Sequence, residues 1–386
     1  MLTRQRHLPA GGEDLAQWCQ VSYIDGGLTR SEILRTSGAS DAYHEWQERT
    51  SPDNGKTWSD ARPLPDVVRQ LPGGGMVTYP CGYQYDETLG IRYEKRMRRL
   101  WPGLEAYTFR WGNRQHPFND HTFVAENGRE VFLKYEDGPD YDPENPFDPA
   151  FCRTNCAYLG VGMAFAPDGA AYYPLVCQPE GRTHTTGGVV LMRRDPASGA
   201  WSPSNQQYID PELSSRGLLE PDVAVLKNGD LLVVMRGANT VTTPGRKWVS
   251  VSTDRGKTLS AVRELRYDDG SSFYSPSSIH SSVRARKNGR LYWVANIVNR
   301  PPEGNSPRYP LYIAEIDEDR VAVRKDSRVL VDGRGEDEPE KVQLSNFSVL
   351  ENRETLDIEI YLTRIGEIAD HFWQGAVYKY VFHPPA

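Results

Sequence analysis

The sequence predicts an all-β fold built from repeated strand and turn units, and three observations carry that prediction. Of the 386 residues, 34 are Gly, 28 are Pro, 21 are Tyr and 9 are Trp, a composition that fits many short strands and tight turns. A unit of apolar strand, Asp/Asn-Gly turn and apolar strand recurs along the chain. A longer turn motif occurs twice almost unchanged. Stretches that would form helices are scarce.

The strand and turn unit has a constant spacing in the middle of the chain. Its turns are Asp168-Gly169, Asn228-Gly229 and Asn288-Gly289, so successive turns lie 60 residues apart. Looser copies occupy residues 23–26, 124–128 and 350–353. An Asp-Gly or Asn-Gly pair between two apolar runs is a strong signal for a β-hairpin. Residues 79–110 lack such a turn, but their alternating aromatic side chains predict the strands of one further unit.

These units predict a β-propeller of six or seven four-stranded blades, forming a single domain over residues 1–386. Counting residues 79–110 as a unit gives seven blades. The unit at 124–128 is short, which leaves six blades with an elaborated loop as the alternative. Ligands of such rings bind at one axial mouth, where inner strands and loops converge. Site residues are therefore expected from several repeats.

The motif that occurs twice reads Ser-x-Asp-x-Gly-x-Thr followed by Trp or Leu, at residues 51–58 and 252–259. Asp53 and Asp254 are expected to accept backbone hydrogen bonds. Gly55 and Gly256 supply a backbone angle that other residues avoid, and Trp58 packs on apolar neighbours. The motif resembles the Asp-box of the sialidase superfamily, whose members are six- or seven-bladed propellers that act on sugars. A degenerate copy occupies residues 194–201. The resemblance implies a structural role for these turns on the outer rim.

Residues 219–236 resemble the sialidase strand pair in which a Glu opens one strand and an Arg closes the next. Glu220 and Arg236 lie eight residues either side of Asn228, so a hairpin there carries both to the same end of a blade. Asp222 lies in the same block as a further substrate-binding candidate. Arg308 lies in a stretch that resembles the segment carrying another substrate-binding arginine. Two guanidiniums at one mouth suit a carboxylate, so an acidic saccharide is the implied partner. A structural salt bridge between Glu220 and Arg236 is the alternative.

The resemblance also assigns the proton donor to Asp41, in the loop before the first Asp-box. Two departures from the family are visible. The strand at residues 18–24 lacks the first arginine of the sialidase triad, and Phe347 occupies the place of the tyrosine nucleophile. Phenylalanine has no hydroxyl, so nucleophilic attack from this position is impossible. A sialidase-like hydrolase with an inverting mechanism, which needs two carboxylates and no nucleophile, is the main hypothesis.

Two further functions stay open. A lyase acting on uronate-containing glycans would use His121 with Tyr274 or Tyr309 to move protons, while arginines neutralise the uronate. The second open function is that of a propeller that binds sugars without catalysis. A purely structural role is the alternative for each of these three side chains.

Composition excludes several classes of protein. The net charge is −7 and no basic block is present, so neither nucleic acid nor a membrane surface is an expected partner. No apolar run reaches membrane-spanning length and the start lacks a signal core, so localisation stays open between the cytoplasm and secretion after removal of a leader. Five cysteines without paired spacing argue against a disulfide framework. The acidic residues 136–149 are expected to form a solvated loop. No cofactor and no metal is expected, and the oligomeric state is open.

Overall fold

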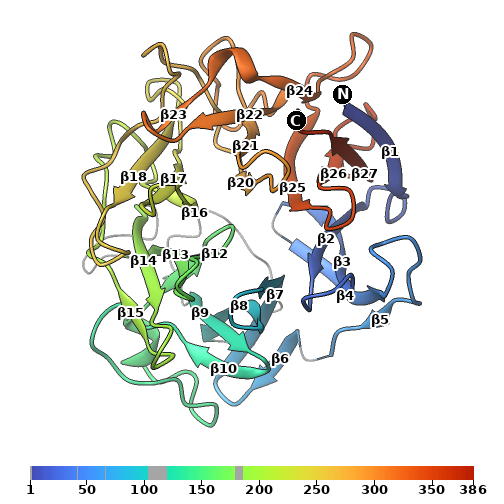
Figure 1. Cartoon of the computed structure of the whole chain (residues 1–386). Coiled ribbons are helices and arrows are strands. Elements are labelled where there is room, and N and C mark those ends of the chain that lie inside the picture. Colours follow the sequence, from blue (N-terminus) through green and yellow to red (C-terminus); the bar gives the residue numbers. More distant parts are fainter. Residues whose placement is uncertain (1, 41, 66, 103–119, 179–185) are drawn as a thin grey trace.

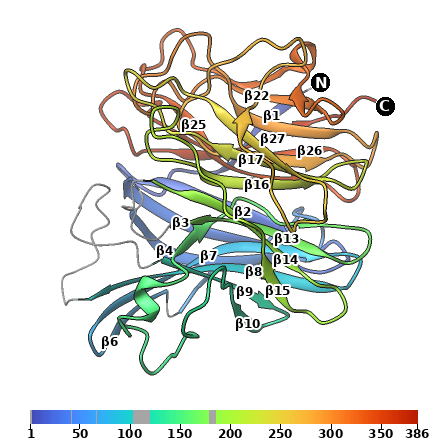
Figure 2. The same ribbon diagram turned by 90° about the vertical axis from the view of Figure 1, so that its left-hand side faces the viewer.

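A computed structural model describes residues 2–40, 42–65, 67–102, 120–178 and 186–386. In these residues six antiparallel sheets follow one another around a ring, each forming one blade of a β-propeller (Figure 1). The side view shows the sheets of neighbouring blades packed face to face around that ring (Figure 2). The predicted all-β propeller is therefore confirmed, with six blades.

The blades are named I to VI. Blade I contains β2 (Ala16–Tyr23), β3 (Arg30–Ala39), β4 (Ala42–Ser51) and β5 (Arg62–Pro63). Blade II contains β6 (Val68–Leu71), β7 (Gly74–Asp86), β8 (Ile91–Pro102), β9 (Asp120–Glu126) and β10 (Arg129–Phe132). Blade III contains β11 (Ala157–Leu159), β12 (Ala164–Phe165), β13 (Ala171–Cys177), β14 (Gly188–Arg194) and β15 (Trp201–Pro203).

The second half of the ring is built in the same way. Blade IV contains β16 (Leu219–Val225), β17 (Leu231–Arg236), β18 (Lys247–Ser252) and β19 (Arg263–Glu264). Blade V contains β20 (His280–Arg284), β21 (Leu291–Asn296), β22 (Leu311–Asp317), β23 (Ala322–Val323) and β24 (Val329–Asp332). Blade VI contains β25 (Gln343–Glu351), β26 (Ile358–Ile365), β27 (Ala376–Phe382) and β1 (Leu2–Leu8). The described residues also contain two 3-10 helices, at Phe151–Arg153 and Lys325–Ser327.

The predicted hairpins explain most of this arrangement. Gly169, Gly229 and Gly289 all have positive φ, of 84°, 87° and 71°, as the tight turns require. The strand after each turn is buried on both faces, because neighbouring blades pack against it. The sequences of these strands are therefore almost entirely apolar, as in LLVVMR of β17.

The count of seven blades is wrong and the alternative of six is confirmed, because two predicted units belong to one sheet. Strand β8 and most of β7 fall within residues 79–110, and the hairpin at Asn127 joins β9 to β10. In the structure β8 pairs with both β7 and β9, which merges the two units into blade II.

Blade VI closes the ring with strands from both ends of the sequence. Strand β1 pairs antiparallel with β27 at the outer edge of that blade. A buried ion pair joins blades I and VI: Arg30 Nη1 lies 2.7 Å from Glu359 Oε2, and the two side chains are 0% and 2% exposed. Arg30 also donates to the hydroxyl of Tyr23 at 2.8 Å, and Lys379 Nζ lies 2.7 Å from Glu359 Oε1. Burial of these charges is therefore offset by direct pairing.

The two Asp-box turns follow the third strand of their blades and have the same hydrogen bonds. Asp53 accepts from the backbone N–H of Thr57 at 2.8 Å and from its hydroxyl at 2.7 Å. Asp254 accepts from the corresponding groups of Thr258 at 2.9 and 2.6 Å. The hydroxyl of each Thr is the main reason why the pKa of each Asp falls to about 2. The degenerate copy at 194–201 joins β14 to β15, which is the equivalent place in blade III.

Replacing Gly256 by alanine should destabilise the fold more than the same change at Gly229. Both glycines have left-handed backbones, with φ of 79° and 87°, so both variants carry strain of about 1 kcal/mol. A Cβ at Gly256 would also lie 2.8 Å from Cε1 of the buried Tyr172, whereas a Cβ at Gly229 meets no atom within 4 Å. Urea denaturation should show a difference of about 1–3 kcal/mol between the variants. Equal losses would contradict the packing role of the turn.

Other expectations from the sequence can be compared with the structure. All five cysteines are free thiols, as expected for a chain without a disulfide framework. Within the acidic segment 136–149, Asp140 pairs with Lys134 at 3.0 Å, while Tyr141 and Phe147 pack on a small core that includes Phe151. Within the described ranges no helix has the length and apolar character that crossing a membrane requires.

Candidate active site

A cavity of about 810 Å³ lies where the inner strands of the six blades converge. Residues from every blade contribute to its wall, as expected for an axial site in a propeller. Among the described residues, its charged lining comprises six basic and three acidic side chains. The basic ones are Arg35, Lys95, Arg216, Arg236, Arg308 and Arg353, and the acidic ones are Asp120, Glu220 and Asp222. The cavity is thus basic in a chain whose net charge is −7.

Glu220 is brought to the cavity by an irregularity in β16. The pairing of β16 with β17 shifts register between Leu219 and Asp222, and Glu220 in between has a φ of 40°. Positive φ is uncommon for a residue with a side chain, and a bulge of this kind re-aims side chains next to active sites. Glu220 Oε2 lies 2.6 Å from Arg236 Nη1, and the Glu220 side chain is 24% exposed.

The charges around Glu220 keep it ionised. Burial by itself would raise the pKa of Glu220. The positive charges of Arg236, Arg308 and Lys247 outweigh burial, so the pKa lies below its usual value. Glu220 is therefore an acceptor of protons rather than a donor at neutral pH.

Three arginines of the cavity wall meet at one serine of the loop before β20. Arg236 Nε donates to Ser277 Oγ at 2.9 Å, and Arg216 Nη2 donates to the same oxygen at 3.3 Å. Arg308 Nη2 donates to the backbone carbonyl of Ser277 at 2.9 Å, and Arg308 Nη1 donates to Gln343 at 3.0 Å. Shared contacts with Ser277 hold the three guanidiniums close together. Their planar forks of donors suit a carboxylate in the cavity.

Asp222 lies deeper in the same wall and differs from Glu220 in its protonation. It is 3% exposed, and its Oδ2 accepts a hydrogen bond from the backbone N–H of Ser282 at 2.5 Å. Burial is the main cause that raises the pKa of Asp222 to about 6, while Lys95 opposes the rise. In one cavity, therefore, the pKa of Asp222 lies above its usual value and the pKa of Glu220 lies below its usual value. This difference is typical of a catalytic acid and base pair.

Replacing Asp222 by asparagine should stabilise the protein at neutral pH. The folded pKa of about 6 exceeds the usual 3.8, so the folded state binds this proton more tightly than the unfolded chain does. The protonated Asp222 contributes its whole stabilising effect below pH 3.8, and this effect is lost as the pH rises through about 6. The gain of Asp222→Asn should approach about 3 kcal/mol above pH 7 and vanish near pH 4. Urea denaturation at both pH values measures this, and a gain independent of pH would contradict it.

Several predicted site residues do not line the cavity. His121 is 0% exposed, and its ring stacks on Phe151 at 4.2 Å between centroids. The guanidinium of Arg246 lies over the ring of Tyr274 at 4.2 Å, and that of Arg334 lies over Tyr309 at 5.7 Å. None of these three side chains is among the described residues that line the cavity. Asp41 lies outside the described residues.

Glu220, Asp222, Arg236 and Arg308 do line the cavity, and so does Phe347. Sequence reasoning missed other members of the site. Lys247 is 0% exposed, donates to the carbonyl of Ser278 at 2.5 Å and is the strand partner of Arg236. A lysine that opens the strand KWVSVS, directly before Trp248 and Val249, is the signal that could have found it. Arg216 precedes β16 in an irregular loop, where no sequence pattern marks it.

The chain was compared with known proteins. No family model and no curated protein sequence matches it. A protein of unknown function from Dyadobacter fermentans matches over 98% of both chains, with a TM-score of 0.63 and 14% identity. The sialidase NanB of Streptococcus pneumoniae matches with a TM-score of 0.61 and 11% identity, over 98% of this chain and 70% of that one. This chain has the sialidase-like propeller fold.

The Hadza microbial sialidase Hz136 also matches the fold of this chain. Its TM-score is 0.59 and its identity 12%, over 95% of this chain and 65% of that one. This chain thus spans about two thirds of the length of the two sialidases. At these identities the likeness shows the fold, and the chemistry has to be argued from the cavity itself.

Proposed function

We propose that this protein is a glycoside hydrolase that acts on a saccharide carrying a carboxylate. The observation that carries the proposal is the convergence of Arg216, Arg236 and Arg308 on Ser277 in the wall of the cavity. Such a site concentrates anionic ligands, because a basic cleft in an acidic protein focuses the local field. The sialidase-like fold supports a sugar as the ligand.

The two carboxyl groups suit hydrolysis with inversion. Asp222, whose pKa is raised to about 6, gives its proton to the glycosidic oxygen as the bond between that oxygen and the anomeric carbon breaks. Glu220, whose pKa is lowered, takes a proton from the water that bonds to the anomeric carbon. Both protons are accounted for, and no nucleophile is required. The absence of a hydroxyl at Phe347 is compatible with this mechanism.

The proposal is tested by incubating the protein with sialosides, uronate oligosaccharides and neutral oligosaccharides. Reducing ends are measured together with the absorbance of the unsaturated sugar that a lyase would release. We expect reducing ends from acidic substrates without that absorbance. Appearance of that absorbance would show that the protein is a lyase and not a hydrolase. Cleavage of neutral sugars alone would contradict the acidic substrate. Binding without cleavage would show that the propeller binds sugars without catalysis.

Variants connect the activity to the two carboxyl groups. Asp222→Asn and Glu220→Gln should each lower kcat at least 100-fold, because proton transfer contributes roughly 10²–10⁴-fold to such reactions. Asp230→Asn is the matched control, since Asp230 lies in the hairpin turn of the same blade and only caps that turn through Asn228. A stabilised Asp222→Asn with unchanged kcat would remove Asp222 from the mechanism.

A further inference from the structure

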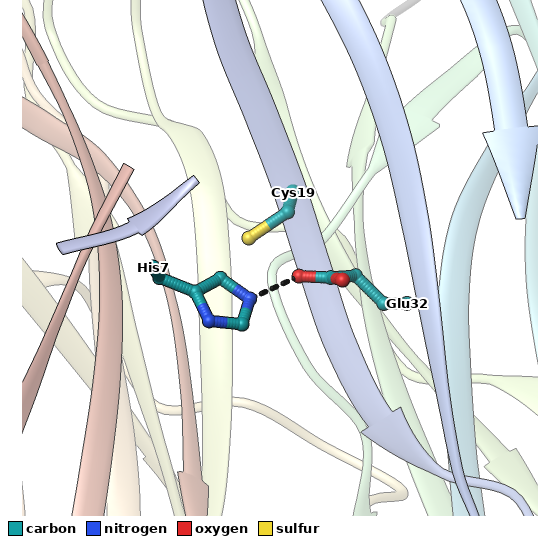
Figure 3. A group of neighbouring side chains, drawn as sticks. All are labelled: His7, Cys19 and Glu32. Atoms are coloured by element: carbon teal, nitrogen blue, oxygen red, sulfur yellow. Dashed lines mark hydrogen bonds and ion pairs between the residues drawn. The ribbon is translucent and has the colours of Figure 1, made fainter. Parts of the chain in front are cut away.

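A cluster of three potential metal ligands lies between strand β1 and blade I. His7 on β1, Cys19 on β2 and Glu32 on β3 each point one ligand atom toward the others (Figure 3). These atoms all lie within 4.8 Å of one another, and His7 Nε2 is 2.5 Å from Glu32 Oε1. Within the described part of the chain this is the one group of three such side chains so close together. It is separate from the arginines and carboxyl groups of the proposed hydrolase site.

The strands place these side chains together for identifiable reasons. The pairing of β1 with β27 shifts register between Arg6 and Leu8, so His7 is an extra residue in its strand. A bulge of this kind turns the side chain away from the regular alternation of the sheet. On the paired strands β2 and β3, Cys19 faces Leu34 and Val21 faces Glu32. Cys19 and Glu32 are therefore diagonal neighbours on one face.

We propose that His7, Cys19 and Glu32 form a zinc site that fastens strand β1 to blade I. Nitrogen, sulfur and oxygen from these residue types are the ligands that Zn²⁺ takes in proteins, and a mixed set of this kind disfavours Ca²⁺ and Mg²⁺. A tetrahedral Zn²⁺ holds nitrogen and oxygen ligands about 3.3 Å apart, so His7 and Glu32 need to separate by about 1 Å. The fourth position is left to water or to a further ligand.

The surroundings of the cluster resemble the second layer of a metal site. Arg49 Nε bonds the other oxygen of Glu32, which orients the carboxylate and leaves Oε1 toward His7. The ring of His7 packs between Tyr361 at 4.8 Å and Trp58 at 6.4 Å between centroids. This aromatic shell excludes water from one side of the cluster.

An ion can reach the cluster through the large cavity. Cys19 lines the wall of that cavity, while Glu32 is 0% exposed behind it. Binding exchanges the proton of the Cys19 thiol for a zinc–sulfur bond, and the proton leaves to solvent. The proton held between His7 Nε2 and Glu32 Oε1 moves to His7 Nδ1 or leaves to solvent, and each of the two freed atoms then binds the ion.

The test loads the full chain, stripped with a chelator, with Zn²⁺ or with Co²⁺ as a spectroscopic probe. We expect one Zn²⁺ per chain by elemental analysis and a higher Tm in its presence, because the ion binds only the folded arrangement. Co²⁺ should give the absorption of a tetrahedral ion with a thiolate-to-cobalt charge-transfer band. These measurements on the unmodified chain need no variant to fold. A chain that retains no stoichiometric metal and shows no charge-transfer band overturns the proposal.

Substitutions locate the ion. Cys19→Ser should remove the charge-transfer band, and His7→Gln should weaken metal binding at least about tenfold. Cys81→Ser is the matched control, because Cys81 is also a half-buried thiol on the cavity wall and lies outside the cluster. A band that survives in Cys19→Ser, or disappears in Cys81→Ser, places the ion elsewhere and overturns the proposal. Hydrolysis by the chelator-treated chain is measured separately and tests only the proposed function.

Discussion

The Arg236→Ala variant is expected to bind acidic saccharides about 10- to 150-fold more weakly than the unmodified protein. The removed guanidinium donates to Glu220 at 2.6 Å and to Ser277 at 2.9 Å, and it lines the cavity beside Arg308. Hydrogen bonds to charged groups contribute about 1.5–3 kcal/mol each, which corresponds to that range of affinity. The variant also leaves the carboxylate of Glu220 without its nearest positive charge, which further repels an anionic ligand.

The measurement is isothermal titration calorimetry with an acidic saccharide that the protein cleaves slowly. Alternatively, both variants are made in a Glu220→Gln background, in which cleavage is expected to be at least about 100-fold slower. Arg246→Ala is the matched control: Arg246 pairs with Glu264 at 2.9 Å on the same blade and does not line the cavity. Its affinity should match that of the unmodified protein. Equal affinities for Arg236→Ala and Arg246→Ala would exclude Arg236 from the ligand site.

The Arg30→Met variant is expected to lose about 3–5 kcal/mol of unfolding free energy. Arg30 is fully buried between blades I and VI, and its removal leaves Glu359 charged in a place that is 2% exposed. Breaking a buried pair by removing one partner is destabilising by that amount. Because Lys379 still contacts Glu359 at 2.7 Å, the loss should fall toward the lower end of the range.

Lys56→Ala provides the control at the same blade boundary. Lys56 pairs with Glu354 at 2.9 Å across blades I and VI, but the two side chains are 65% and 36% exposed. Exposed pairs of this kind contribute at most about 1 kcal/mol. Urea denaturation of both variants should therefore separate them clearly. If Arg30→Met were no less stable than Lys56→Ala, the buried pair would not be what holds the ring closed.

Much of the fold could be predicted from local signals in the sequence. A hairpin is encoded by two turn residues between apolar strands, and the Asn228 and Asn288 turns form as expected. The number of blades was harder, because it depends on whether β8 and β9 pair with each other. That pairing joins strands across residues 103–119, where no short turn signals it.

The candidate site could be predicted only in part, for a similar reason. Glu220 and Arg236 are placed together by one hairpin, so their proximity follows from chain geometry. Ser277 and Arg216 reach the same point from two different loops, and no spacing in the sequence encodes that meeting. The bulges that redirect Glu220 and His7 are equally invisible, because a bulge has no fixed sequence signature.

Pairing of β1 with β27 has a consequence for how the protein is made. During translation β1 emerges before blades I to V, whereas its partner β27 emerges after them. Blades I to V can fold in order as they emerge, since the strands of each are neighbours in the sequence. The ring itself can close only after β27 has emerged. Until then the unpaired edge of β1 and the open edge of blade I are the surfaces on which a chaperone would act or aggregation would begin.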